Sequence, residues 1–226
     1  MRSGGSALKY GSSFIIVMAK LYFLGGENVT KQDSKYINKI AFKEAADSPR
    51  VLVLPWARTP SNKTQKRWKR LLKYFRNIGA GSVDMADYGE TFKEISRKIE
   101  CSDLLYLTGG FTTVLLERLR KKNLAPLLRN YGKVIVGRSA GALALCKKCF
   151  LTDRRESLVK MIEGLGIVDF GIKVHYRPSG DVELKRLSKK EKIYAIPEHS
   201  ALVYDRKSLS FIGDVYMFQN GKKSHA

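Results

Sequence analysis

Residues 133–142 read KVIVGRSAGA, and this stretch decides the fold. The β-branched run at 134–136 predicts a buried strand, and the alanine- and leucine-rich residues 140–145 predict a helix directly after it. A glycine stands two positions before and two positions after Ser139, in the pattern G-x-S-x-G that is typical of a nucleophile elbow. The alternative is a tight strand-to-helix turn in which Ser139 only caps the helix.

The sequence before this stretch alternates between short apolar runs and longer amphipathic segments. Strands are predicted at 21–24, 51–54, 82–85 and 104–107, and helices near 31–46, 59–77, 92–99 and 112–129. Such alternation predicts an α/β fold with a mostly parallel sheet sandwiched by helices. Ligands of these sheets gather at the carboxyl ends of the strands, where the predicted elbow and the turn at 108–113 both lie.

Length and composition predict a single domain. The 226 residues, 44% of them hydrophobic, suffice for one sizeable core, which we assign to residues 18–226. Residues 1–17 are rich in glycine and serine and precede a second methionine, so we expect a poorly ordered leader or extension there. No apolar run approaches 18 residues, and we therefore expect a cytoplasmic protein that does not cross or bind a membrane.

The three cysteines, an odd number, favour a reducing compartment over a disulfide framework. Cys146 and Cys149 form a C-x-x-C that we place late in the elbow helix, with one thiol buried and one partly exposed. No second Cys/His pair stands at zinc spacing, and the zinc-peptidase, P-loop and dinucleotide motifs are absent from the sequence. We therefore expect neither a metal nor a cofactor.

A serine nucleophile needs a base that accepts its proton, and the chain has three histidines. His225 is the penultimate residue and is expected to fray. His175 ends an apolar, strand-like run, which favours a position at the rim of an active site. His199, after Pro197 and Glu198, is the rival base.

Four segments in this order resemble the peptidase E group of serine peptidases, whose fold is similar to that of class I glutamine amidotransferases. They are the glycine-rich turn TGGFT at 108–112, the elbow at 137–142, KVHY at 173–176 and IPE at 196–198. The resemblance covers most of the chain from Lys20 onward. It implies a serine peptidase that cleaves short peptides, with N-terminal Asp-X dipeptides as the family's usual substrates.

The resemblance also implies roles for individual residues. Ser139 corresponds to the nucleophile, His175 to the base and Glu198 to the acid that orients the base. Asp153, in the stretch after the elbow helix, is the alternative acid. The backbone N–H groups of Gly110 and Ala140 correspond to the oxyanion hole.

Two residues next to these segments bear on the substrate. Phe111 is a departure, because the family often has a short polar residue after the paired glycines that can touch the substrate. Arg138, immediately before the serine, either binds an acidic side chain or terminal carboxylate of the substrate or forms a structural ion pair.

A binding function of another class is suggested by charge. The chain carries a net charge of +21, and the predicted helix near 59–77 is rich in lysine and arginine interleaved with aromatic residues. We favour a buried stripe of Trp68, Leu71, Leu72 and Phe75 with a solvated cationic face. No recognised nucleic-acid motif accompanies the charge, so no specific nucleic-acid partner is expected.

Overall fold

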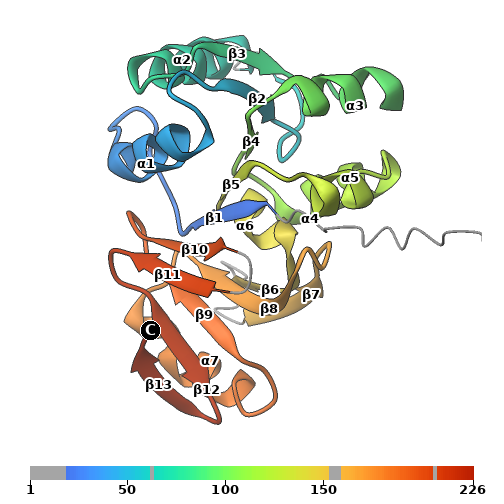
Figure 1. Cartoon of the computed structure of the whole chain (residues 1–226). Helices are drawn as coiled ribbons and strands as arrows, with labels where there is room; N and C mark the ends of the chain where they lie inside the picture. The colour runs from blue at the N-terminus through green and yellow to red at the C-terminus, as the bar shows by residue number, and fades with distance from the viewer. Residues whose placement is uncertain (1–18, 62–63, 153–158, 206–207) are drawn as a thin grey trace, which may run out of the picture.

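The computed structural model describes residues 19–61, 64–152, 159–205 and 208–226. Within these ranges the strands form two sheets, one of seven strands and one of six. In Figure 1 the first half of the chain, coloured blue to yellow, fills the upper part of the view, and the orange and red second half fills the lower part. The two parts meet near β1, β5 and α6.

The seven-stranded sheet has the order β11-β10-β1-β5-β4-β2-β3. Strands β1, β5, β4, β2 and β3 run parallel to one another, β10 pairs antiparallel with β1, and β11 pairs antiparallel with β10. The strands are β1 Lys20–Leu24, β2 Arg50–Leu54, β3 Ser82–Met85, β4 Leu104–Leu107, β5 Val134–Arg138, β10 Ala201–Asp205 and β11 Ser208–Ile212. The prediction of a mostly parallel α/β sheet is confirmed for this part of the chain.

Helices cover both faces of this sheet because its strands are apolar on both faces. Successive residues of β1 illustrate this, since Tyr22 packs into one hydrophobic cluster with α1 and α2, whereas Phe23 packs into another with α3 to α6. The helices are α1 Lys35–Ala45, α2 Thr64–Asn77, α3 Phe92–Cys101, α4 Thr112–Lys121, α5 Ala125–Asn130 and α6 Ala140–Leu145. The single helix predicted at 112–129 is thus two helices, divided near Asn123, whose φ is +49°.

The six-stranded sheet was not predicted as a unit. Its order is β13-β12-β9-β8-β6-β7, with β6, β8 and β9 parallel and the other pairs antiparallel. One side of it joins the hydrophobic cluster of α3 to α6, and the other packs against α7. The elements are β6 Cys146–Thr152, β7 Val159–Glu163, β8 Val168–Val174, a 3-10 turn at Pro178–Gly180, α7 Asp181–Leu187, β9 Ile193–Ile196, β12 Tyr216–Gln219 and β13 Lys222–His225.

The basic helix α2 packs much as the sequence predicted. Leu71, Tyr74 and Phe75 are buried, whereas Trp68 and Leu72 are only half-buried. Its lysines and arginines are exposed.

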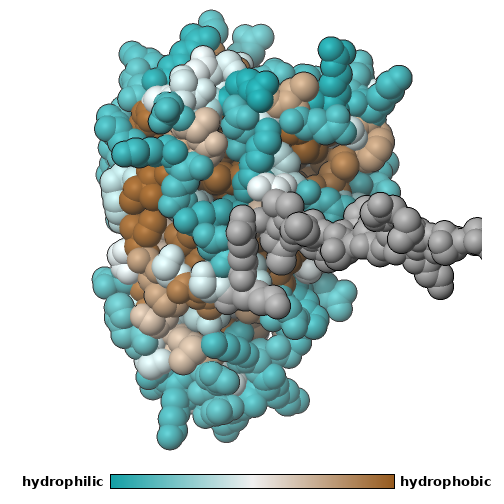
Figure 2. All heavy atoms as spheres, viewed as in Figure 1, coloured by the Kyte–Doolittle hydropathy of each residue, from teal (hydrophilic) through white to brown (hydrophobic). Residues whose placement is uncertain are grey.

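Figure 2 shows one face of the molecule, with hydrophilic surface at its upper and lower ends and apolar residues toward its middle. No helix in the described ranges is long and apolar enough to span a bilayer.

The cysteine prediction was wrong in two respects. Cys146 begins β6 instead of ending the elbow helix, and both Cys146 and Cys149 are buried and free. Their thiols donate to backbone carbonyls of α6, at 3.6 Å to Ala142 O and 3.0 Å to Leu143 O. Burial raises the pKa of the Cys149 thiol to about 12 and raises that of Cys146 well above its usual value.

These environments predict how the thiols react. At pH 8 a disulfide reagent such as DTNB should react quickly with Cys101 alone, because Cys101 is exposed and the other two thiols are buried and protonated. The measurement is the thiolate released per chain, expected to be one equivalent in the native protein and three in denaturant. Cys101→Ser should abolish the fast phase, and a remaining fast phase in that variant would contradict this packing.

Candidate active site

Ser139 lies at the turn between β5 and α6. Its backbone has φ +51° and ψ −109°, a conformation that residues other than glycine rarely adopt. Its amide donates to Leu24 O at the end of β1, at 3.0 Å. A strained residue held this way presents its side chain at the carboxyl edge of the sheet.

Two glycines make this turn possible. A Cβ on Gly141 would lie 2.2 Å from Leu107 O, and one on Gly137 would lie 2.7 Å from Ala142 N. Neither distance is tolerated between nonbonded atoms, so β4, β5 and α6 approach this closely only with glycine at both positions. The predicted strand, turn and helix are all present.

His175 follows β8 and contacts the serine directly. The Ser139 hydroxyl donates to Nε2 of His175 at 2.7 Å, and Nδ1–H donates to Oε1 of Glu198 at 2.5 Å. The carboxylate acceptor at Nδ1 fixes the tautomer in which Nε2 is free to accept. Both side chains are nearly half exposed, at 47% for His175 and 41% for Glu198. The structure thus brings together three residues that lie far apart in the sequence.

The other histidines lie elsewhere. His199 Nδ1 is 3.5 Å from Asp33 Oδ1, and the backbone carbonyl of His199 accepts from the Tyr36 hydroxyl. His225 is 3.4 Å from Asp214. The acid considered as an alternative, Asp153, lies outside the described residues.

Gly26 lies against the contact between His175 and Glu198, a role that the sequence analysis missed. A Cβ at this position would lie 1.9 Å from Glu198 Oε2 and 2.6 Å from His175 Nδ1. Glycine at this position therefore lets the segment after β1 pass close to the imidazole and the carboxylate. The two consecutive glycines directly after the strand predicted at 21–24 are the sequence feature that could have indicated this close approach.

The glycine-rich turn after β4 lies beside Ser139. A Cβ on Gly109 would be 3.3 Å from the Ser139 Cβ, and one on Gly110 would be 2.3 Å from Ala57 O. The Phe111 amide donates to the same Ala57 carbonyl at 2.7 Å. Ala140 is the first residue of α6, where backbone N–H groups have no partner within the helix. Phe111 itself is 62% exposed and does not line the cavity described next.

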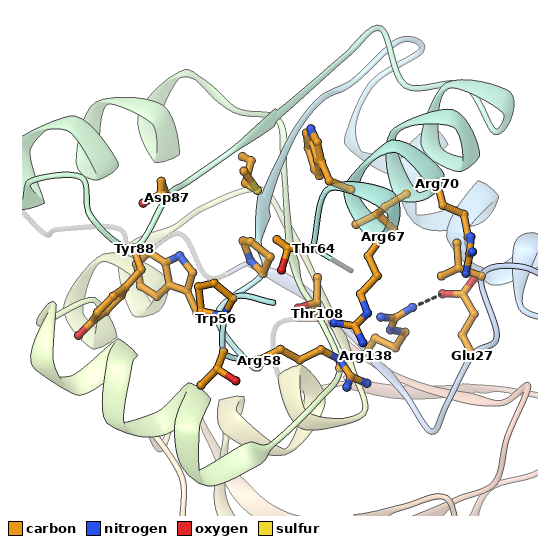
Figure 3. A pocket seen from close by; sticks show the side chains of 18 of the residues that line it. Glu27, Trp56, Arg58, Thr64, Arg67, Arg70, Asp87, Tyr88, Thr108 and Arg138 are labelled. Atoms are coloured by element: carbon orange, nitrogen blue, oxygen red, sulfur yellow. Dashed lines mark ion pairs between the residues drawn. The ribbon is translucent and has the colours of Figure 1, made fainter. Parts of the chain in front are cut away.

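A cavity of about 430 Å³ lies next to the turn that carries Ser139, and Figure 3 shows side chains that line it. Ser139, His175 and Glu198 are not among its lining residues. Its walls come from the segment after β1, the segment after β2, the start of α2, and the ends of β4 and β5. Gly109 and Arg138, the neighbours of Ser139, both line it. Figure 3 shows the guanidinium groups of Arg58, Arg67 and Arg138 turned toward one another in its middle.

Arg138 lines the cavity and pairs with Glu27 at 3.7 Å, so the ion pair considered for it is present, whereas binding of a substrate carboxylate stays a prediction. The Glu27 side chain is fully buried and accepts from Asn38 Nδ2 at 2.9 Å and from the hydroxyls of Tyr74 and Tyr106. Burial beside this carboxylate raises the pKa of both tyrosines, so their hydroxyls remain protonated donors. The sequence analysis did not single out Glu27.

The chain matches the sequence profile described as Peptidase family S51 over residues 21–212. The chain belongs to peptidase family S51. The resemblance to peptidase E read from the four motifs is thereby confirmed.

Among the described residues, no group of three His, Cys, Asp or Glu side chains is placed to hold a metal ion. The expectation that this member of family S51 needs no metal or cofactor stays a prediction.

Individual relatives agree with the family. An uncharacterized peptidase of Listeria monocytogenes is 29% identical over 126 residues, which are 50% of this chain and 62% of that protein. A crystal structure from Listeria monocytogenes EGD-e, provisionally named peptidase E, aligns with 86% of this chain and 98% of its own at a TM-score of 0.64 and 23% identity. A peptidase from an acI-B1 actinobacterium aligns with 93% of this chain and 95% of its own, at a TM-score of 0.71 and 17% identity. These two structures share the α/β fold.

The contact at Gly26 predicts a variant that disrupts this site without touching its polar residues. Gly26→Ala should reduce labelling of Ser139 by a fluorophosphonate probe by at least about tenfold, because the added methyl displaces His175 or Glu198. The measurement is the rate of covalent labelling, read by mass spectrometry.

Gly180→Ala is the matched control, since its Cβ would only reach Leu184 at 3.9 Å. Unchanged labelling in Gly26→Ala, with a native melting temperature, would contradict the close approach at Gly26.

Proposed function

We propose that this S51 peptidase hydrolyses short peptides, including those with N-terminal aspartate, through a Ser139-His175-Glu198 triad and a covalent acyl-enzyme. The observation that carries the proposal is the unbroken hydrogen-bond chain from the Ser139 hydroxyl through the His175 ring to the Glu198 carboxylate. A serine hydroxyl is a weak nucleophile until a base accepts its proton, and this chain supplies base and orienting acid together.

The reaction proceeds in two halves. The Ser139 Oγ attacks the peptide carbonyl carbon while its proton moves to Nε2 of His175, and Glu198 stabilises the imidazolium that forms. The backbone N–H groups of Gly110 and Ala140 bind the oxyanion. His175 then protonates the leaving nitrogen, the C–N bond breaks and the acyl-enzyme remains. Water, deprotonated by His175, attacks the acyl carbon and releases the acid product with Ser139 restored.

Arg138 gives a reason to expect acidic substrates. It immediately precedes the nucleophile, lines the cavity and is 16% exposed, so its guanidinium is available to a carboxylate from solvent. Its pair with Glu27 is 3.7 Å long, which leaves donors of the guanidinium free for a charge-assisted contact with substrate.

The first test is hydrolysis of Asp-X, Glu-X and neutral dipeptides by the wild type and by Ser139→Ala. We expect turnover of acidic dipeptides by the wild type, and at least about a 10⁴-fold lower kcat in Ser139→Ala because the nucleophile is removed. Full activity of Ser139→Ala would refute the proposal. An equal melting temperature of the two proteins serves as the folding control.

A second test separates the candidate acids and bases. Glu198→Gln should lower kcat by orders of magnitude because the amide no longer stabilises the imidazolium, and His175→Ala should do the same because the base is lost. Asp153→Asn and His199→Ala are the matched controls and should retain activity near that of the wild type. Loss of activity in Asp153→Asn, with Glu198→Gln active, would transfer the role of the acid to Asp153.

A further inference from the structure

The cavity beside Ser139 carries more positive charge than one acidic side chain of a substrate would neutralise. Two acidic residues, Glu27 and Asp87, are among its lining residues. Five of the lining residues are arginines, namely Arg58, Arg67, Arg70, Arg118 and Arg138.

The two acidic residues do not balance this charge. Glu27 is buried and already accepts hydrogen bonds from an asparagine and two tyrosines besides its pair with Arg138. Asp87 accepts from the Gly89 amide at 2.7 Å, and Figure 3 shows it on the far side of the cavity, next to Tyr88. Among the residues that the structure describes, Arg58 and Arg67 form no ion pair with a carboxylate.

Arg58 and Arg67 also lie close to Arg138. The Arg58 side chain is packed at the glycine-rich turn, where a Cβ on Gly110 would lie 2.8 Å from its Cγ. Burial together with the charges of Arg67 and Arg138 lowers the pKa of Arg58. Three like charges that face one another repel, and an anion bound among them removes this repulsion while it gains attraction from each.

The position of His175 indicates which part of a substrate enters the cavity. His175 protonates the leaving nitrogen in the proposed reaction, so the leaving group lies on the side of His175 and of β8. The lining residues of the cavity all come from residues 27–138, and neither His175 nor Glu198 is among them. The cavity therefore receives the acyl portion, which precedes the scissile bond.

The volume agrees with an acyl portion longer than one residue. The cavity measures about 430 Å³, within the range of roughly 300–1,000 Å³ for pockets that enclose a drug-sized ligand. Trp68 and Tyr88, both half-buried, add aromatic surface to it, against which the stem of a peptide can pack.

We propose that this cavity binds two consecutive acidic side chains on the acyl side of the scissile bond, one at Arg138 and the other between Arg58 and Arg67. This specificity rests on the proposed peptidase function and extends it. The preferred substrates are then acidic peptides with at least two residues before the cleaved bond, in contrast to peptides with a single N-terminal aspartate.

The test compares Asp-Asp-p-nitroanilide with Asn-Asp-p-nitroanilide, which differ in one carboxylate and have nearly the same shape. We expect kcat/KM to be about 10- to 100-fold higher for Asp-Asp, because a charge-assisted contact is lost with asparagine. Arg67→Gln and Arg58→Gln should each reduce this ratio to within a few fold of one. Lys69→Gln, also on α2 but outside the cavity lining, is the matched control and should keep the ratio of the wild type.

A binding measurement separates failure of this inference from failure of the proposed function. Asp-Asp-amide and Asn-Asp-amide are titrated into Ser139→Ala by calorimetry, where no turnover is needed. Tighter binding of Asp-Asp-amide, lost in Arg67→Gln, would support the cavity assignment even if no p-nitroanilide were cleaved. Equal affinities for the two peptides, or equal kcat/KM values in an active wild type, would overturn the assignment and leave the triad proposal standing.

Discussion

The end of β1 holds the three parts of the site together through its backbone. Leu24 O accepts from the Ser139 amide, Gly25 O accepts from the His175 amide, and Gly25 N donates to Ser200 O, each at 3.0 Å. A Cβ on Gly25 would lie 1.9 Å from Pro197 O, so these approaches require glycine. The nucleophile turn, the histidine and the loop of Glu198 are thereby positioned against one stretch of rigid, buried strand.

The two sheets have different roles in this arrangement. The parallel sheet presents Ser139 and the glycine-rich turn at its carboxyl edge, as is general for open α/β sheets. The second sheet contributes His175, and Glu198 follows a strand of the same sheet. Both Ser139 and His175 have φ of +51°, a conformation that costs of order 1–3 kcal/mol and persists where surrounding contacts hold it. The backbone bonds to Leu24 and Gly25 provide such contacts at both residues.

The sequence predicted the parallel sheet better than the second sheet for a physical reason. Strands buried on both faces read as continuous apolar runs, as in LLYL at 104–107. The edge strands β7 (VKMIE) and β13 (KKSH) carry charged residues and give no such signal. The helical pattern of 140–145 continues into Cys146, but pairing of β6 with β7 and β8 overrides it. Ser139 is marked by a local motif and His175 by the apolar run that it ends, whereas the proposed role of Glu198 came from family resemblance.

The cationic cavity illustrates what local sequence patterns leave out. Arg58, Arg67 and Arg138 belong to the segment after β2, to α2 and to β5, so no window of sequence shows that they converge. A net charge of +21 predicts attraction of anions in general, without a location. Glu27 fixes the position of one of these charges, because its buried carboxylate pairs with Arg138. The carboxylate is itself held by hydrogen bonds from Tyr74, Tyr106 and Asn38. One arginine is thereby anchored next to the nucleophile, and the two arginines facing it remain available to charges that arrive with a substrate.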